Sequence, residues 1–152
     1  MRNKNVIPYP GNDVIFLISP PRSGSTMLQR ILGSHSEIHT VQETWSMLHP
    51  IYALRNSGIS SEFNSRSASI ALSEFISSIE YGKDTINNAI RAYAKILYSA
   101  AIQSGKKNLF LDKTPRYYFI INELIEIFPQ ARFIILKRNP LAVLASILKS
   151  WV

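Results

Sequence analysis

One segment decides the fold of this chain: Val14-Ile15-Phe16-Leu17-Ile18-Ser19-Pro20-Pro21-Arg22-Ser23-Gly24-Ser25-Thr26-Met27-Leu28. Its apolar first part predicts a buried strand that stops at Ser-Pro-Pro. Small residues and one arginine follow, and apolar residues then return at helical spacing. A strand, a tight loop and a helix N-terminus in this order bind phosphate, because several backbone N–H groups and the positive helix end converge on one point. We therefore expect a site for a nucleotide-like anion at residues 20–27, where Arg22 adds a planar cation.

This loop differs from the phosphate loop of nucleoside triphosphatases, which reads G-x-x-x-x-G-K-[ST]. Ser19 stands in place of the first glycine, and Ser25 stands in place of the lysine that reaches the β- and γ-phosphates. The absence of that lysine argues against hydrolysis of ATP or GTP. A P-loop nucleotide kinase or nucleoside triphosphatase stays as an alternative interpretation, and a comparison of ATP with other nucleotides decides it.

The composition indicates a globular domain. The 152 residues are enough for one domain with a core, and 46% of them are hydrophobic. Cysteine is absent, so the chain has neither a disulfide framework nor a thiolate site. No apolar run reaches the length of a membrane span and no signal-peptide pattern opens the chain, so a cytoplasmic location is the simplest expectation.

The formal net charge of +7 comes from 17 basic and 10 acidic residues that are scattered along the chain. A nucleic-acid-binding protein can have this excess, but no Lys/Arg-rich segment or basic helix with interleaved aromatic residues is present. A polyanionic small ligand explains the excess more simply, and we expect no nucleic-acid partner. A non-catalytic module that binds anions or nucleic acid is the second alternative.

Short β-rich segments alternate with helical patterns along the chain. We expect strands at 13–19, 38–41, 108–112 and 132–137, a surface loop at 56–69, and helices at 24–34, 44–55, 68–79, 85–103, 116–128 and from 140 onwards. This order is typical of a mostly parallel sheet covered by helices on both faces, a three-layer α/β/α fold. Ligands of such sheets bind at the carboxyl ends of the strands. Four charged residues follow the expected strands: Arg22, Glu43, Lys113 and Arg138.

Two motifs together resemble those of sulfotransferases that use 3′-phosphoadenosine 5′-phosphosulfate (PAPS). Pro21-Arg22-Ser23-Gly24-Ser25-Thr26 resembles the loop that binds the 5′-phosphosulfate, and Arg138-Asn139-Pro140 with Ser146 resembles the motif that binds the 3′-phosphate. The resemblance is closest to the branch that contains protein-tyrosine sulfotransferases and related bacterial enzymes, and it implies a P-loop-like sulfotransferase fold. It also implies PAPS as co-substrate, PAP as product, no metal, and donor-binding residues Arg22, Ser23, Gly24, Ser25, Thr26, Arg138 and Ser146.

The same resemblance implies the catalytic residues. Glu43 corresponds to the acidic residue proposed as general base in that branch, because the acceptor hydroxyl must lose its proton as it attacks sulfur. Lys113, in the run Asp112-Lys113-Thr114-Pro115, corresponds to a lysine that neutralises the bridging oxygen as the sulfuryl group leaves. Arg22 stabilises the same transferring group.

Other titratable residues offer alternatives for these roles. The three histidines, His35, His39 and His49, compete with Glu43 for the role of base. Asp112, at the end of an apolar strand, also resembles a magnesium-binding Walker B acid. The absent loop lysine disfavours that interpretation, and transfer of a sulfuryl group from a PAPS-type donor needs no metal.

The resemblance covers residues 13–152 of one expected domain, 1–152, whereas sulfotransferase domains are usually much longer. The chain stops at Lys149-Ser150-Trp151-Val152, inside an expected helix without a cap. We therefore expect a truncated chain with little activity of its own, whose uncovered apolar helix favours self-association. The sequence does not identify the acceptor, which is a peptide, a carbohydrate, a lipid or a small alcohol.

Overall fold

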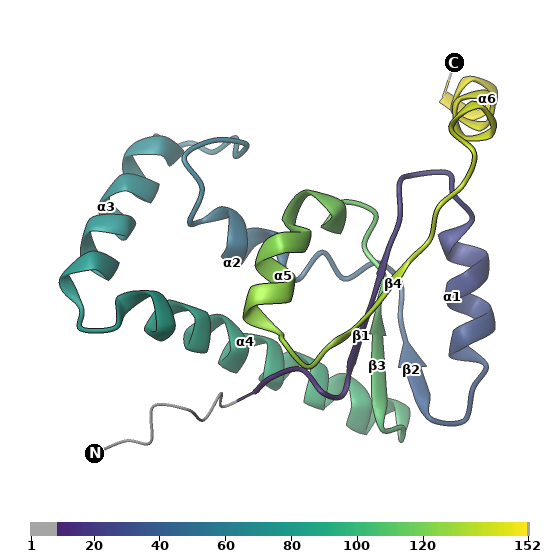
Figure 1. The fold of residues 1–152 in the computed structure, drawn as a ribbon, viewed down its shortest axis with the longest axis horizontal. Coiled ribbons are helices and arrows are strands. Elements are labelled where there is room, and N and C mark those ends of the chain that lie inside the picture. Colours follow the sequence, from purple (N-terminus) through teal and green to yellow (C-terminus); the bar gives the residue numbers. More distant parts are fainter. Residues whose placement is uncertain (1–8, 152) are drawn as a thin grey trace.

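Four parallel strands form the centre of the molecule. The computed structural model describes residues 9–151, so the expectations that concern residues 1–8 and Val152 lie outside the described residues. The strands are β1 (Val14–Ile18), β2 (Ile38–Thr40), β3 (Leu109–Asp112) and β4 (Arg132–Ile135), in the spatial order β2-β3-β1-β4 (Figure 1). In the register, Phe16 lies beside Asp112 on one side and Phe133 on the other.

The central strand β1 is buried along its whole length and sends alternate side chains to two hydrophobic clusters. Val14, Phe16 and Ile18 join the larger cluster, whereas Ile15 and Leu17 join the smaller one. Burial on both faces explains why the strand is a continuous apolar run rather than an alternating one.

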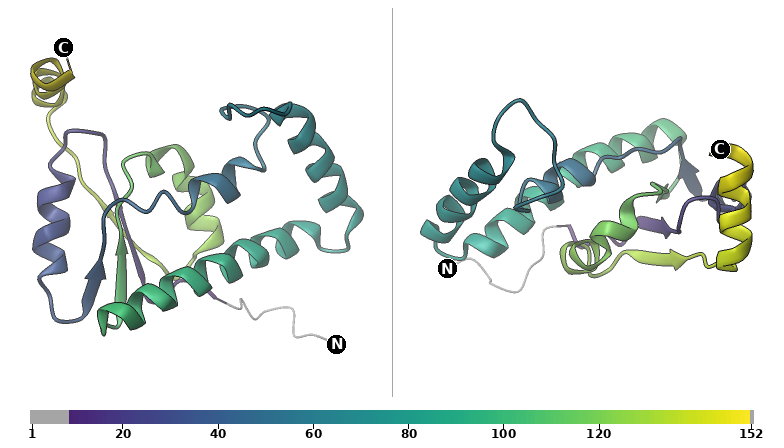
Figure 2. Two further views of the ribbon diagram at one scale, coloured as in Figure 1. Left: turned by 180° about the vertical axis from the view of Figure 1, so that it is seen from behind. Right: turned by 90° about the horizontal axis from the view of Figure 1, so that it is seen from above.

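Helices cover both faces of this sheet (Figure 2). Helix α1 (Ser25–Gly33) packs on the face of the smaller cluster through Leu28 and Leu32. The opposite face is covered by α2, α4, η1 and α5, with the bounds Leu48–Tyr52, Gly82–Gly105, Tyr117–Ile120 and Ile121–Ile127. The predicted three-layer α/β/α fold is therefore confirmed, with every pairing of strands in the described residues parallel.

Two further helices extend away from the sheet. Helix α3 (Ser65–Ser78) packs against α4, and helix α6 (Pro140–Trp151) lies beyond the carboxyl ends of β1 and β4 (Figure 1). Helix α6 exposes Leu141, Leu144 and Leu148. Within residues 9–151, no helix is both long and apolar enough to cross a membrane.

The predicted helix 44–55 is largely wrong, because only α2 forms within it. Trp45 adopts a left-handed backbone conformation with φ of 56°, which interrupts a right-handed helix. Thr44 is held instead by a hydrogen bond to Asp112. Glu43 therefore lies in an irregular segment before α2 and does not stabilise a helix N-terminus.

Two other boundaries differ from the prediction. The expected helix 116–128 begins as the 3-10 turn η1, and α5 follows it. The expected loop 56–69 is shorter, because α3 begins at Ser65. Asn64 caps that helix by accepting the backbone N–H of Ser67, an N-cap that its residue type favours.

Candidate functional site

The loop between β1 and α1 has the backbone geometry of an anion-binding loop. Arg22 and Gly24 both adopt positive φ, 62° and 93°, so the chain turns sharply before α1 begins at Ser25. No side chain caps the N-terminus of α1, so its first N–H groups have no capping acceptor. The Ser23 side chain is buried, and its hydroxyl has no hydrogen-bond partner in the structure. An anion in this loop would supply acceptors for these donors.

Arg22, Arg138 and Ser146 meet at this loop although the first is far from the other two in sequence. The Arg22 Nε donates a hydrogen bond to the Ser146 Oγ at 3.1 Å, and an Arg138 side-chain N–H donates to the backbone carbonyl of Arg22 at 2.9 Å. Together with Gly24, Ser25 and Thr26 they line a hollow of about 260 Å³. The structure therefore brings together the residues predicted to bind the donor, with Ser23 buried in the same loop.

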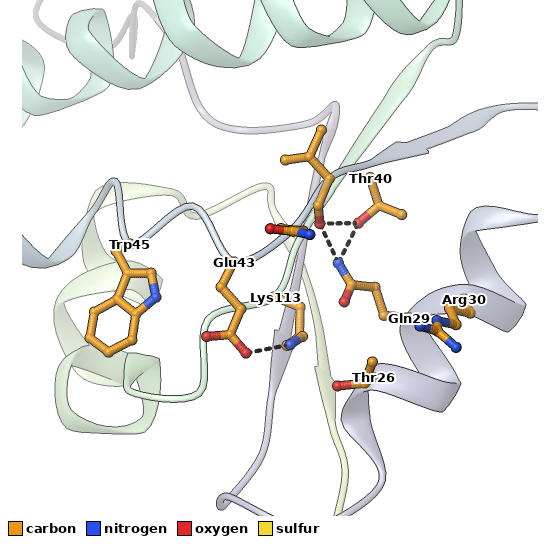
Figure 3. A pocket seen from close by; sticks show the side chains of 9 residues that line it. Thr26, Gln29, Arg30, Thr40, Glu43, Trp45 and Lys113 are labelled. Carbon is orange, nitrogen blue, oxygen red and sulfur yellow. Dashed lines mark hydrogen bonds and ion pairs between the residues drawn. The ribbon is translucent and has the colours of Figure 1, made fainter.

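A larger hollow of about 660 Å³ lies beside the loop and contains the two predicted catalytic residues of opposite charge (Figure 3). The Lys113 Nζ forms an ion pair with the Glu43 Oε1 at 2.7 Å. Lys113 directly follows β3 and Glu43 follows β2, and these strands are neighbours in the sheet. The Lys113 side chain is 4% exposed whereas that of Glu43 is 35% exposed. The carboxylate is thus accessible from the hollow, and the ammonium group is held against the protein.

Gln29 is a residue of this hollow that the sequence analysis did not identify. Its Nε2 donates hydrogen bonds to the Thr40 Oγ1 at 2.8 Å and to the Val41 carbonyl at 2.6 Å. The Thr40 hydroxyl in turn donates to the Leu111 carbonyl at 2.8 Å. Gln29 therefore ties α1 to the ends of β2 and β3. The periodicity of α1 places Gln29 near the sheet, but it does not reveal these partners.

Behind the ion pair, the carboxylate of Asp112 is fully buried and accepts hydrogen bonds from four hydroxyl groups. The donors are Tyr98 at 2.6 Å, Tyr117 at 2.9 Å, Thr44 at 2.9 Å to both oxygens, and Thr114 at 3.4 Å. Burial raises the pKa of the Asp112 carboxyl, although the hydroxyl donors oppose this change. We call these five residues the Asp112 cluster.

The Asp112 cluster disagrees with the interpretation of Asp112 as a magnesium ligand. A Walker B acid needs a free oxygen that faces the phosphates, whereas here hydroxyl groups occupy both carboxylate oxygens. Within residues 9–151, no group of three or more His, Asp or Glu side chains is placed to hold a metal ion. The arrangement instead joins two segments of the site.

This junction positions the ion pair. Asp112 precedes Lys113 in the chain, and Thr44 follows Glu43, so the hydrogen bond between Asp112 and Thr44 connects the backbones that carry both charged groups. A second bond runs from the Trp45 backbone N–H to the Thr114 Oγ1 at 3.1 Å. Both partners of the ion pair are therefore anchored by their direct neighbours in sequence.

The three histidines lie outside the hollow that contains Glu43. His35 accepts the backbone N–H of Glu37 at 3.1 Å in the turn between α1 and β2. The His39 ring packs on Phe110, and His49 lines a separate hollow. Glu43, and none of the three histidines, therefore lines the hollow together with Lys113.

The fold is that of a P-loop-like α/β protein. It has a parallel sheet, a loop with anion-binding geometry after the inner strand β1, and charged residues at the carboxyl ends of the neighbouring strands. The model of the sulfotransferase family matches residues 13–152, so the chain belongs to the sulfotransferase family. This family is the one that the motifs of the loop and of residues 138–146 predict.

The chain is also similar to one curated protein and to one solved structure. The nodulation protein NoeE of Sinorhizobium fredii (strain NBRC 101917 / NGR234) is 34% identical over 152 residues, which cover 98% of this chain and 34% of NoeE. The sulfotransferase domain from the Synechococcus PCC 7002 olefin synthase superposes with a TM-score of 0.51 at 23% identity, covering 93% of this chain and 54% of that domain. The chain thus spans about a third of the first relative and about half of the second, and the second likeness concerns the fold alone.

Proposed function

We propose that this chain binds PAPS as part of a sulfotransferase domain that transfers the sulfuryl group of PAPS to an acceptor hydroxyl or amine. The observation that carries the proposal is the meeting of Arg22, Arg138 and Ser146 beside the Glu43–Lys113 pair. Cations and an uncapped helix N-terminus suit a ligand with several anionic groups. An adjacent carboxylate suits an acceptor that must lose a proton.

The donor is held from both ends. The 5′-phosphosulfate occupies the loop, where the N–H groups at the start of α1, the buried Ser23 hydroxyl and the Arg22 guanidinium donate to its oxygens. The 3′-phosphate is bound by Arg138 and Ser146, which line the same hollow. When the donor binds, the Arg22–Ser146 hydrogen bond is exchanged for bonds to the ligand.

The transfer step requires a base at the oxygen that attacks sulfur and positive charge at the oxygen that leaves. The acceptor oxygen attacks sulfur and forms the new S–O bond, while its proton passes to the Glu43 carboxylate. The S–O bond to the 5′-phosphate breaks, and the bridging oxygen leaves with the electron pair as part of PAP. Lys113 and Arg22 stabilise the negative charge that develops on this oxygen. No metal enters this scheme, because protein cations provide the charge stabilisation.

The kinase or nucleoside triphosphatase alternative differs in its ligand. Such a protein stabilises the β- and γ-phosphates of ATP with a loop lysine and Mg²⁺. In this chain Ser25 occupies that loop position and Asp112 is enclosed by hydroxyl groups. We therefore expect PAP to bind and ATP–Mg²⁺ to bind much more weakly.

Thermal unfolding with each nucleotide tests the proposal. A ligand at about a hundred times its Kd stabilises the native state by roughly 2.7 kcal/mol. We therefore expect PAP to raise the melting temperature, and ATP–Mg²⁺ at the same concentration to change it little. The variant Arg138→Ala should weaken PAP about tenfold or more, from the loss of a charge-assisted bond worth roughly 1.5–3 kcal/mol. Lys149→Ala, on the exposed end of α6, is the control for nonspecific charge and should leave PAP binding unchanged. Equal stabilisation by ATP–Mg²⁺ and PAP would refute the proposal.

A further inference from the structure

A second hollow adjoins the one that contains the Glu43–Lys113 pair. It measures about 300 Å³ and is lined by Trp45, Leu48, His49, Tyr52, Gly58, Ile59, Ser60, Arg116 and Phe119, and we call it the aromatic pocket. The three hollows form a series, because Thr26 lines both the loop hollow and the Glu43 hollow, and Trp45 lines both the Glu43 hollow and the aromatic pocket. The aromatic pocket therefore lies on the side of the ion pair that is remote from the loop.

The lining of the aromatic pocket differs from that of its neighbour. Three aromatic rings line it, and two of them, Trp45 and Phe119, are 44% and 48% exposed although they are large and apolar. Arg116 lies over the Phe119 ring, with its guanidinium carbon 6.0 Å from the ring centroid. The described residues that line the pocket include Arg116 and His49 but no carboxylate. This lining suits a flat apolar group that is neutral or carries negative charge, and it disfavours a cation.

The loop that forms the outer wall comes unusually close to one of these rings. Gly58 has φ of 92°, and a Cβ added to it would lie 2.8 Å from the Tyr52 Cε1. Only glycine meets both requirements, because other residues rarely adopt this φ and would collide with the ring. The wall is therefore shaped by a residue that permits close contact with Tyr52.

Trp45, the residue between the two hollows, is held in a strained conformation. Its φ of 56° costs of the order of 1–3 kcal/mol for a residue that is not glycine. Two hydrogen bonds fix the backbone here. The Trp45 N–H donates to the Thr114 Oγ1, and the hydroxyl of the preceding residue, Thr44, donates to Asp112. Figure 3 shows the indole at the edge of the Glu43 hollow, next to the Glu43 side chain. An exposed ring is thus kept at a fixed place beside the proposed base.

We propose that the aromatic pocket binds the part of the acceptor that does not react, and that this part is a planar apolar group of one or two rings. The inference rests on the proposed function, since it places the acceptor hydroxyl at Glu43 and the remainder of the molecule beyond Trp45. The volume of about 300 Å³ lies at the lower end of the range for small-molecule sites, which sets the size of the group. The acceptor class is a hydroxyl compound with an aromatic body.

Nuclear magnetic resonance of the two tryptophan indole N–H groups tests this proposal with 2-naphthol as the probe. The chain has two tryptophans, so the variant Trp151→Phe assigns both resonances. The Trp45 resonance should shift in a saturable way as 2-naphthol is added. Phe119→Ala should weaken this binding at least fivefold, and cyclohexanol, whose ring is puckered, should bind more weakly than 2-naphthol. Phe75→Ala, which removes a 63% exposed ring on α3 away from the pocket, is the matched control and should leave the affinity unchanged.

A parallel titration with PAP separates this inference from the proposed function. If PAP binds normally but Phe119→Ala leaves the affinity for 2-naphthol unchanged, the aromatic pocket is not the site and the inference fails alone. If PAP does not bind, the proposed function fails, and the indole titration still reports whether the pocket takes planar groups. Equal affinities for cyclohexanol and 2-naphthol would overturn the preference for a planar group. Because Phe119 is about half exposed, its truncation leaves the core intact.

Discussion

Removal of one hydroxyl group from the Asp112 cluster, in the variant Tyr117→Phe, should destabilise the protein strongly. Tyr117 is fully buried, and its hydroxyl donates to the Asp112 Oδ2 at 2.9 Å and accepts the backbone N–H of Met47 at 3.2 Å. The ring itself stays in place, because phenylalanine has the same shape. The variant therefore removes one donor from a buried carboxylate and leaves a buried backbone N–H without its acceptor.

The magnitude follows from these two bonds. A hydrogen bond to a charged group contributes about 1.5–3 kcal/mol, and a buried donor left without a partner costs about 1–3 kcal/mol. Asp112 keeps the hydroxyl groups of Tyr98, Thr44 and Thr114, so part of the first loss is recovered. We expect a decrease of roughly 2–4 kcal/mol in the free energy of unfolding. For a chain of this size that corresponds to a fall in melting temperature of about 4–16 °C.

The assay is urea unfolding at pH 7 followed by circular dichroism, with Tyr118→Phe as the control. Tyr118 is the adjacent tyrosine, and its hydroxyl accepts an exposed hydrogen bond from the Arg116 side chain at 3.2 Å. Its substitution should change the free energy of unfolding by less than about 0.5 kcal/mol. Equal effects of the two substitutions would show that the Asp112 cluster does not contribute as its geometry indicates.

Three further predictions concern the site. Glu43→Gln, in a form of the protein that shows turnover, should lower that turnover roughly 10²–10⁴-fold while PAP affinity stays near that of the wild type, and turnover near that of the wild type would exclude Glu43 as base. Because burial raises the pKa of Asp112 above its ordinary 3.8, the native state keeps this proton to higher pH than the unfolded state, so this group's contribution to stability falls as pH rises above about 3.8. Urea midpoints from pH 4 to 7 should therefore show the wild type losing stability relative to Asp112→Asn, and an opposite trend would contradict the direction of the pKa change. Gly24→Ala should cost about 1–2 kcal/mol through its positive φ alone, because no atom lies within 4 Å of the added Cβ, and a larger loss by the same unfolding assay would indicate a clash that the structure does not show.

Two kinds of feature are predicted well from the sequence. Some depend on the local pattern of apolar residues, and others depend on the rule that the carboxyl ends of parallel strands lie at one edge of the sheet. The continuous apolar run of β1 predicts its burial, and Pro140 predicts the start of α6. Because parallel strands end at the same edge of a sheet, the rule also places Glu43 near Lys113, and the structure joins them in an ion pair. Their roles in catalysis stay predictions.

Features that depend on distant partners were missed. Trp45 lies in a segment whose apolar and polar residues alternate as in a helix, yet its backbone is left-handed. This conformation is stabilised by a hydrogen bond to Thr114, 69 positions further along the chain. The hydroxyl groups of the Asp112 cluster come from a helix, a 3-10 turn and two loops. No spacing in the sequence therefore predicts the cluster. The role of a buried polar residue such as Gln29 is equally hard to predict from the sequence, because it depends on the hydrogen-bond partner and not on the residue type.

The ion pair between Glu43 and Lys113 has a consequence for the order in which ligands bind. Lys113 is almost completely enclosed, so its ammonium group needs an anion beside it, and in the free protein that anion is the Glu43 carboxylate. On the proposed assignment the arriving donor brings a second anion to Lys113, and the carboxylate is then released to face the acceptor. The base would thus become available only after the donor has bound. On this assignment we expect the donor to bind first and the acceptor second.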